Sequence, residues 1–257
     1  MPFMKPTGRV TTVALFLAAV AGSVVAGGNA KNDDFRDAKK MLERQVYADH
    51  RVTLYCGYEF DKNKNISLPA TFVTDKHKER AKKVEWEHVV PAENFGRSFE
   101  YWREGSGRCV DKKGHFFKGR RCAEELSEEY RLMQADMYNL YPAVGAVNAI
   151  RSNFIFEMLP GVPNRFGSCE MKIQNQRAEP PERARGQIAR TMLYMENAYP
   201  SRYQLSSKQR RLAEAWDKTY PVDEWECLRA TRIAKLQGNV NAIVNDACRR
   251  AGLANVR

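Results

Sequence analysis

The chain has 257 residues and carries 42 Lys or Arg against 31 Asp or Glu, which gives a formal net charge of +11. This length suits one domain with a sizeable core, and no stretch after residue 30 is long and apolar enough to cross a bilayer. Because the basic residues are spread along the chain, they favour a broad basic face that attracts polyanions over a basic tail.

The first predicted element is an export signal. Lys5 and Arg9 precede an apolar run over residues 10–26, and cleavage after Ala26 or Ala30 fits the rule of small residues at the cleavage site. The run is short for a membrane anchor, which is the alternative. We therefore expect a periplasmic or secreted protein without membrane insertion, with a signal peptide over residues 1–30 and a functional domain over residues 31–257.

The rest of the chain predicts an α+β domain, because strand-like segments come early and helical periodicity dominates later. A basic, glycine-containing loop or hairpin is expected over Gly105–Gly119, and Ser127 is a candidate helix cap. The predicted strands are Arg51–Tyr58 and Val84–Val90. The predicted helices are Asp34–Asp49, Ser127–Leu140, Pro142–Arg151, Glu182–Asn197, Gln204–Trp216 and Asp223–Leu236.

Six cysteines in an exported chain predict up to three disulfides. No CxxC pair is present, so metal ligation is the weaker alternative. The sequence does not choose among the fifteen possible pairings. Closure of local loops favours Cys109 with Cys122 and Cys227 with Cys248, and the remaining cysteines are Cys56 and Cys169.

The segment from Glu85 to Pro91, EWEHVVP, carries the strongest chemical signal. A neutral histidine such as His88 is suited to taking a proton from water, and Glu87 offers the oxygen ligand that Mg²⁺ prefers. Successive side chains of a regular strand point to opposite faces, so both residues reach one site only if the strand ends or bulges there. The alternative is a core histidine on an apolar face.

Other site classes fit the sequence less well. It contains no HExxH zinc motif, no GxSxG serine elbow and no GxxxxGK[ST] phosphate loop. A cysteine nucleophile competes with the disulfide interpretation of all six cysteines.

The string WEHVVPAENFG at residues 86–96 closely resembles the signature of the bacterial endonuclease I family, whose members are ββα-metal, or His-Me finger, nucleases. Further strings of the chain match that family in order, so the resemblance covers nearly all of residues 31–257. They are GRRC (119–122), YRLMQADMYNLYPAVGAVN (130–148), RSNF (151–154), FGSCEMKI (166–173), PPERARGQIARTMLYM (180–195), AWDKTYPVDEWEC (215–227) and RIAKLQGN (232–239).

The resemblance implies a single domain with a ββα-metal core and a role for four residues. His88 matches the general base, Glu87 the first metal ligand, Asn148 the second ligand, and Arg120 the arginine that holds the phosphate, with Arg121 as the neighbour one register away. It implies one bound divalent cation, Mg²⁺ or alternatively Mn²⁺ or Ca²⁺. The expected activity is sequence-nonspecific cleavage of DNA and of RNA to products with a 5′-phosphate.

Further basic residues are weaker candidates for phosphate contacts. Arg183 and Arg190 lie at helical spacing, and Arg151 lies one helical turn beyond Asn148. A solvated helix face is the alternative for all three.

The chain departs from the family pattern at four positions. Gln134 stands where the family often has Glu, Tyr138 where it often has His, and Ala149 and Ile150 where it often has Gly and Asp. These changes bear on the residues that orient His88 and the metal-bound waters.

The leading interpretation is therefore a monomeric exported nuclease. An exported nucleic-acid-binding protein without turnover is the first alternative, and it predicts loss of the base or of a ligand. A protein that binds acidic glycans or lipid is the second, and it leaves the long resemblance unexplained.

Overall fold

Two short antiparallel strands, β1 (Val84–His88) and β2 (Leu140–Val144), pair in the core of the protein. The structure is a computed structural model, and it describes residue 1 and residues 27–253. The register places Val84 opposite Val144 and His88 opposite Leu140. β2 continues directly into helix α7 (Gly145–Arg151), so the chain forms strand, strand and helix in that order, with residues 89–139 inserted between the strands.

The prediction of a helix starting at Pro142 was wrong, because Pro142 lies within β2 opposite Trp86 and the helix begins at Gly145. Its carbonyl oxygen accepts a hydrogen bond from the backbone N–H of Leu54, 2.8 Å away on the edge of β2 remote from β1. The side of Pro142 that lacks an N–H therefore faces that edge, and the hydrogen bonds between the two strands are kept.

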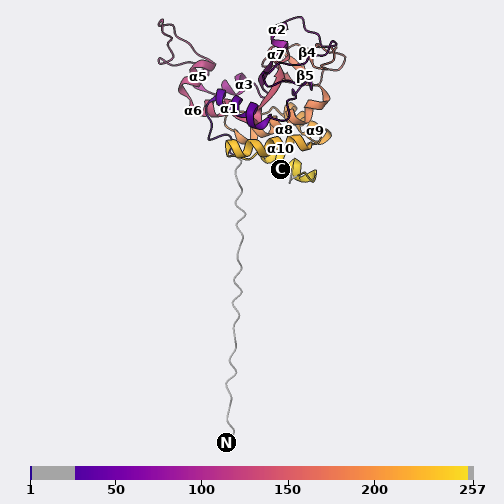
Figure 1. The fold of residues 1–257 in the computed structure, drawn as a ribbon. Coiled ribbons are helices and arrows are strands. Elements are labelled where there is room, and N and C mark those ends of the chain that lie inside the picture. The colour runs from indigo at the N-terminus through magenta and orange to yellow at the C-terminus, as the bar shows by residue number, and fades with distance from the viewer. Residues whose placement is uncertain (2–26, 254–257) are drawn as a thin grey trace.

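Short helices surround this strand pair, and long helices close one side of the domain. In Figure 1, α8, α9 and α10 lie together below α7 and β5, whereas α5 and α6 lie beside α1 and α3. The N-terminal part contains α1 (Phe35–Met41), the π-helix η1 (Leu42–Val46) and α2 (Lys78–Ala81). The insertion contains α3 (Ala92–Gly96), α4 (Glu100–Arg103), α5 (Arg120–Leu126), α6 (Glu128–Gln134) and the 3₁₀ turn η2 (Met137–Asn139).

A second small sheet and four helices complete the domain. In the order β3-β5-β4, β3 is parallel and β4 antiparallel to β5. The strands are β3 (Ile155–Phe156), β4 (Lys172–Gln174) and β5 (Arg177–Glu179), and the helices are α8 (Glu182–Ala198), α9 (Ser207–Thr219), α10 (Glu224–Gln237) and α11 (Ala242–Arg250).

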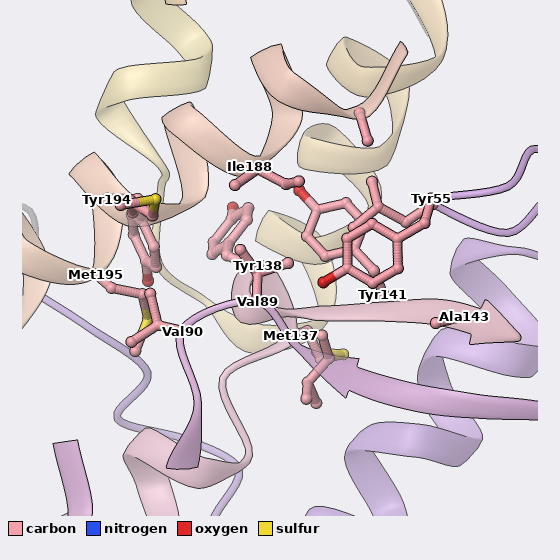
Figure 2. Packing of buried hydrophobic residues seen from close by; sticks show 14 of the residues in the cluster. Tyr55, Val89, Val90, Met137, Tyr138, Tyr141, Ala143, Ile188, Tyr194 and Met195 are labelled. Carbon is pink, nitrogen blue, oxygen red and sulfur yellow. The ribbon is translucent and has the colours of Figure 1, made fainter. Parts of the chain in front are cut away.

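The apolar face of α8 covers the strand pair. Figure 2 shows Ile188 and Tyr194 of α8 above the segment that carries Tyr138 and β2. The centroids of the Tyr138 and Tyr194 rings are 4.9 Å apart in an edge arrangement. This geometry stabilises the pair beyond the burial of the two rings. This packing holds β2 with all five of its residues buried.

The expected α+β class and most expected helices are confirmed. Ser127 caps α6 by accepting a hydrogen bond from the N–H of Tyr130, and Asp223 caps α10 through the N–H of Glu226. The helix after Ser127 is shorter than predicted, because it ends at Gln134 and the Asp136 carboxylate instead accepts the N–H of Tyr138 to start η2.

The strand predicted over Arg51–Tyr58 is absent, and the segment forms tight turns instead. Gly57 has a φ of +70°, which favours glycine, and its N–H donates to the carbonyl of Thr53. One isolated bridge, between Val52 and Glu59, is all that remains of strand pairing in the segment. The aliphatic and aromatic residues there pack into the core without forming a ladder.

All six cysteines are paired. Cys109–Cys122 and Cys227–Cys248 confirm the two local pairings that the sequence favours, and the third disulfide joins Cys56 to Cys169. The third links segments 113 residues apart, compared with 13 residues for Cys109–Cys122. None of the helices in the described part of the chain has the length and apolar character of a membrane span.

We expect the long-range disulfide to contribute most to stability, because a longer closed loop restricts the unfolded chain more. Replacing Cys56 and Cys169 together with Ala should lower the free energy of unfolding by about 4–5 kcal/mol, compared with about 3 kcal/mol for the pair Cys109 and Cys122. Urea unfolding of the two double variants measures the difference. Equal losses would show that loop length does not set the contribution of these bridges.

Candidate active site

A cavity of about 270 Å³ opens where β1 ends, between α1, α3, α5 and α7. A larger groove, of about 770 Å³, lies between β3 and α9, but no histidine is among its lining residues in the described chain. The smaller cavity holds the side chains suited to acid–base chemistry and metal binding. Its lining consists of Phe35, Trp86, Glu87, His88, Pro91, Ala92, Glu93, Arg120, Asn148, Ser152 and Asn153.

Glu87 and His88 both line this cavity because β1 ends at His88. The alternation of a regular strand would have placed the two side chains on opposite faces. The end of the strand is therefore the feature that joins the two residues in one site, as one of the alternatives drawn from the sequence requires.

The Glu87 carboxylate is held on one oxygen and free on the other. Its Oε1 accepts hydrogen bonds from the Tyr55 hydroxyl and from Nη1 of Arg151, each at 2.7 Å. Burial raises the pKa of Glu87, while the positive charge of Arg151 and the Tyr55 hydrogen bond oppose that shift. Oε2 receives no hydrogen bond from any described residue, so it remains available as an oxygen ligand.

The His88 ring is neutral and has a defined tautomer. Its Nε2 lies 2.9 Å from the carbonyl oxygen of Gln134, and a carbonyl only accepts, so Nε2 carries the hydrogen. Nδ1 is then the basic nitrogen. Burial, followed by the nearby charge of Arg120, lowers the pKa of His88 to about 3, so the ring is uncharged at neutral pH. The Phe35 ring, 5.0 Å away between centroids, forms one wall around it.

Asn148 lies on α7 and is oriented by two charged residues. Its Nδ2 donates to Oε2 of Glu85 at 2.8 Å, and Arg80 donates to both oxygens of the same carboxylate at 2.6 Å. Since the amide nitrogen is engaged, the other amide position must be the oxygen. Oδ1 of Asn148 accepts no hydrogen bond within the described residues and is a second available oxygen ligand.

Arg120 begins α5 and brings an exposed guanidinium to the cavity. Its neighbour Arg121 is held elsewhere, because its Nε donates to Glu125 at 3.0 Å and its guanidinium lies 3.8 Å from the centre of the Phe117 ring. Of the two candidate arginines, Arg120 therefore faces His88.

Comparison with known proteins places the chain in a family. The family model for Endonuclease I matches residues 31–248. An extracellular deoxyribonuclease of Aeromonas hydrophila is 40% identical over 88% of this chain and 94% of its own length. A periplasmic deoxyribonuclease of the same organism is 40% identical over 83% and 86%, and Endonuclease-1 of Buchnera aphidicola subsp. Acyrthosiphon pisum (strain APS) is 37% identical over 81% and 80%. The chain belongs to the endonuclease I family.

Membership in the endonuclease I family confirms the resemblance drawn from the sequence strings, and with it the prediction of an endonuclease. The names of the Aeromonas relatives, one extracellular and one periplasmic, agree with the predicted location outside the cytoplasm. A protein that binds acidic glycans or lipid finds no support in these comparisons.

Two departures from the endonuclease I pattern have a clear place in the structure. Gln134 contacts His88 through its backbone carbonyl, which any residue offers, while its side chain donates to Glu124 at 2.6 Å. The Tyr138 hydroxyl donates to the carbonyls of Ala230 and Asn239, and Tyr138 does not line the cavity. The structure gives no specific role to Ala149 or Ile150.

The interpretation of Arg151 and Arg190 as phosphate contacts was wrong, because each is only 1% exposed. Arg190 forms ion pairs with Glu226 and Asp217 inside the domain. Arg183 is exposed, yet its Nη1 donates to the carbonyls of Thr53 and Leu54 at 3.0 and 2.5 Å. Arg151 and Arg190 are therefore buried within the domain, whereas Arg183 stays a predicted phosphate contact.

Sequence reasoning missed Tyr55, Glu85 and Phe35 as parts of the site. One signal was available: Glu85 and Glu87 are two residues apart in a strand and so share a face. Nothing local indicated Tyr55 or Phe35, which approach the site from distant segments. Among the described residues there is no group of three or more His, Cys, Asp or Glu side chains able to hold a metal, and the pair Glu87 and Asn148 includes only one residue of that kind.

The buried role of Arg151 leads to a test. We expect Arg151→Ala to lower the free energy of unfolding by about 3–5 kcal/mol, because it leaves the Glu87 carboxylate buried without its partner. The exposed Arg121→Ala should change it by no more than about 0.5 kcal/mol. Urea unfolding compares the two, and an equally small effect at both positions would restore Arg151 as a surface contact.

Proposed function

We propose that this endonuclease hydrolyses phosphodiester bonds of DNA and RNA without regard to base sequence, with His88 as the general base. The observation that carries the proposal is the neutral His88 ring, whose Nδ1 has no hydrogen-bond partner in the described part of the chain and which lines the same cavity as Arg120. A base that is neutral at physiological pH accepts a proton from water without first losing one of its own.

The order β1, β2 and α7 supports a ββα-metal core as the frame of this site. His88 stands at the end of the first strand and Asn148 on the helix that follows the second. The long insertion between the strands returns the chain to the site twice, through Arg120 and through the carbonyl of Gln134.

We propose that Glu87 and Asn148 hold one divalent cation. Oε2 of Glu87 and Oδ1 of Asn148 are oxygen donors without another partner in the described chain, and both residues line the cavity. Such a pair suits Mg²⁺, which keeps several waters, and it also accepts Mn²⁺ or Ca²⁺. When bound, the cation would offset negative charge on the phosphate and on the leaving oxygen.

The side chains of the protein have separate roles in the proposed reaction. Nδ1 of His88 takes a proton from a water molecule as the water oxygen attacks phosphorus. Arg120 donates charge-assisted hydrogen bonds to the phosphate oxygens. The bond from phosphorus to the 3′ oxygen breaks, and that oxygen takes a proton from a water molecule while His88 returns its proton to solvent. One product then carries a 5′-phosphate and the other a 3′-hydroxyl.

Affinity for the substrate would come from the basic surface. The chain keeps a net charge of +9 without residues 1–30, because that segment contains two basic residues, Lys5 and Arg9, and no acidic residue. Phosphate contacts hold a nucleic acid without reading its bases.

We propose that the protein acts as a monomer.

The cleavage site of the signal peptide is a further part of the proposal. Residues 2–26 lie outside the described residues, but Asn29 is buried in the fold. Its backbone N–H donates to the Tyr199 hydroxyl and its side chain to the carbonyl of Leu132, both at 2.8 Å. Cleavage after Ala30 would remove these contacts, so we favour cleavage after Ala26.

Plasmid cleavage tests the function directly. We expect Mg²⁺-dependent nicking and degradation that EDTA abolishes and that His88→Ala lowers at least about 100-fold, because general-base catalysis contributes at least that factor. His77→Asn is the matched control, since His77 is exposed in a left-handed conformation that asparagine tolerates. Binding of DNA without cleavage by the unaltered protein, with several divalent metals, would instead support the non-catalytic nucleic-acid-binding protein.

The orientation of Asn148 gives a prediction about the metal. Glu85→Gln should raise the Mg²⁺ concentration for half-maximal activity by roughly 10- to 100-fold, because a neutral amide no longer forces the Asn148 amide to point its oxygen into the cavity. Calorimetric titration with Mn²⁺ should show the same loss of affinity without any turnover. Glu79→Gln, at an exposed carboxylate paired with Lys82, is the control. Equal metal affinity in both variants would remove Glu85 from this role.

A further inference from the structure

The loop over residues 105–119, called here the arm, projects from the domain just before α5. Figure 1 shows it beside α5, extending away from the body of the molecule. The arm is held in shape despite its exposure. The Cys109–Cys122 disulfide joins it to α5, and Val110 bridges Phe116 across it.

A tight turn closes the tip of the arm. The Asp111 carboxylate accepts the backbone N–H groups of Lys113 and His115, at 2.8 and 2.9 Å. These hydrogen bonds lower the pKa of Asp111 and keep its charge engaged with the backbone. The single acidic residue of the arm therefore stabilises the turn.

The arm is strongly basic, and its cations are unengaged. None of its Lys or Arg side chains forms an ion pair with a carboxylate in the described part of the chain, and all of them are exposed. These residues are Arg108, Lys112, Lys113 and Lys118. Four positive charges on one projection attract a polyanion.

An aromatic side chain stands among these charges. Phe116 is 56% exposed, which is unusual for a large apolar residue of a domain that buries most of its aromatic side chains. A β-carbon at Gly105 would lie 2.5 Å from Cζ of Phe116, so the ring lies directly against the backbone there. The ring is thus supported from beneath while much of its surface is free.

We propose that the arm binds a strand of the nucleic acid substrate, with Phe116 stacking on an unpaired base and the four cations contacting phosphates. Exposed aromatic rings set among positive charges are how proteins bind single strands without reading their sequence. The arm also ends beside the candidate active site, since Gly119 is followed by Arg120, which lines the same cavity as His88. This inference rests on the proposed function, and it adds a preference for unpaired over fully paired substrate.

The test measures binding in a His88→Ala background, where the oligonucleotide stays intact. We expect Phe116→Ala to weaken binding of a short fluorescein-labelled single strand by roughly 5- to 100-fold, and binding of the matching duplex much less. Replacing Lys112 and Lys113 together with Ala should lower the slope of log Kd against log salt by roughly 0.7 for each phosphate that the variant no longer neutralises. Fluorescence anisotropy at several salt concentrations provides both measurements.

The matched control replaces Lys218 and Lys235, exposed lysines of α9 and α10 that have no ion pair in the described chain. Arm variants that bind like this control would overturn the proposal, and so would equal losses for single strand and duplex after Phe116→Ala. Because binding needs no turnover, failure of the unaltered enzyme to cleave DNA with Mg²⁺ would overturn the proposed function separately. Near-ultraviolet circular dichroism and disulfide titration check that each variant keeps its fold.

Discussion

The site depends on one buried ion pair, between Arg151 at the end of α7 and Glu87 near the end of β1. Nη1 of Arg151 donates to the Glu87 carboxylate and to the carbonyl of His88, at 2.7 and 2.9 Å, and its Nη2 donates to the carbonyl of Val89 at 2.6 Å. The guanidinium thereby satisfies the backbone where the strand stops and joins strand to helix. Replacing either partner of such a pair lowers the stability of the fold, because the other charge would stay buried alone.

Because of this ion pair, the two oxygens of the Glu87 carboxylate have different surroundings. Arg151 and Tyr55 share one oxygen of Glu87, and the second oxygen accepts no hydrogen bond from the described residues. Asn148 shows the same division, because its amide nitrogen donates to Glu85 while its oxygen has no hydrogen-bond partner among the described residues. Each proposed ligand is thus positioned by a charged neighbour before any cation arrives, which lowers the ordering cost of binding.

His88 is kept neutral by burial among positive charges, and that environment is assembled from distant segments. Phe35 comes from the first helix, and Arg120 and the carbonyl of Gln134 come from the insertion between the strands. The insertion therefore supplies both the arginine of the cavity and the hydrogen bond that sets the tautomer. The projecting arm belongs to the same insertion, so catalysis and capture of the substrate would be governed by one stretch of chain.

The sequence by itself determined the family and the helices with strong caps and periodicity, and it favoured the two short-range disulfides, because each rests on local spacing or on strings of residues. Only the tertiary structure decided which arginines are free. Arg120 and Arg151 look alike in the sequence, yet one is exposed in the cavity and the other is 1% exposed against Glu87. Burial and partners are set by residues far along the chain, so local pattern does not carry them. For the same reason Tyr55 and Phe35 emerged as parts of the site only when the chain was folded.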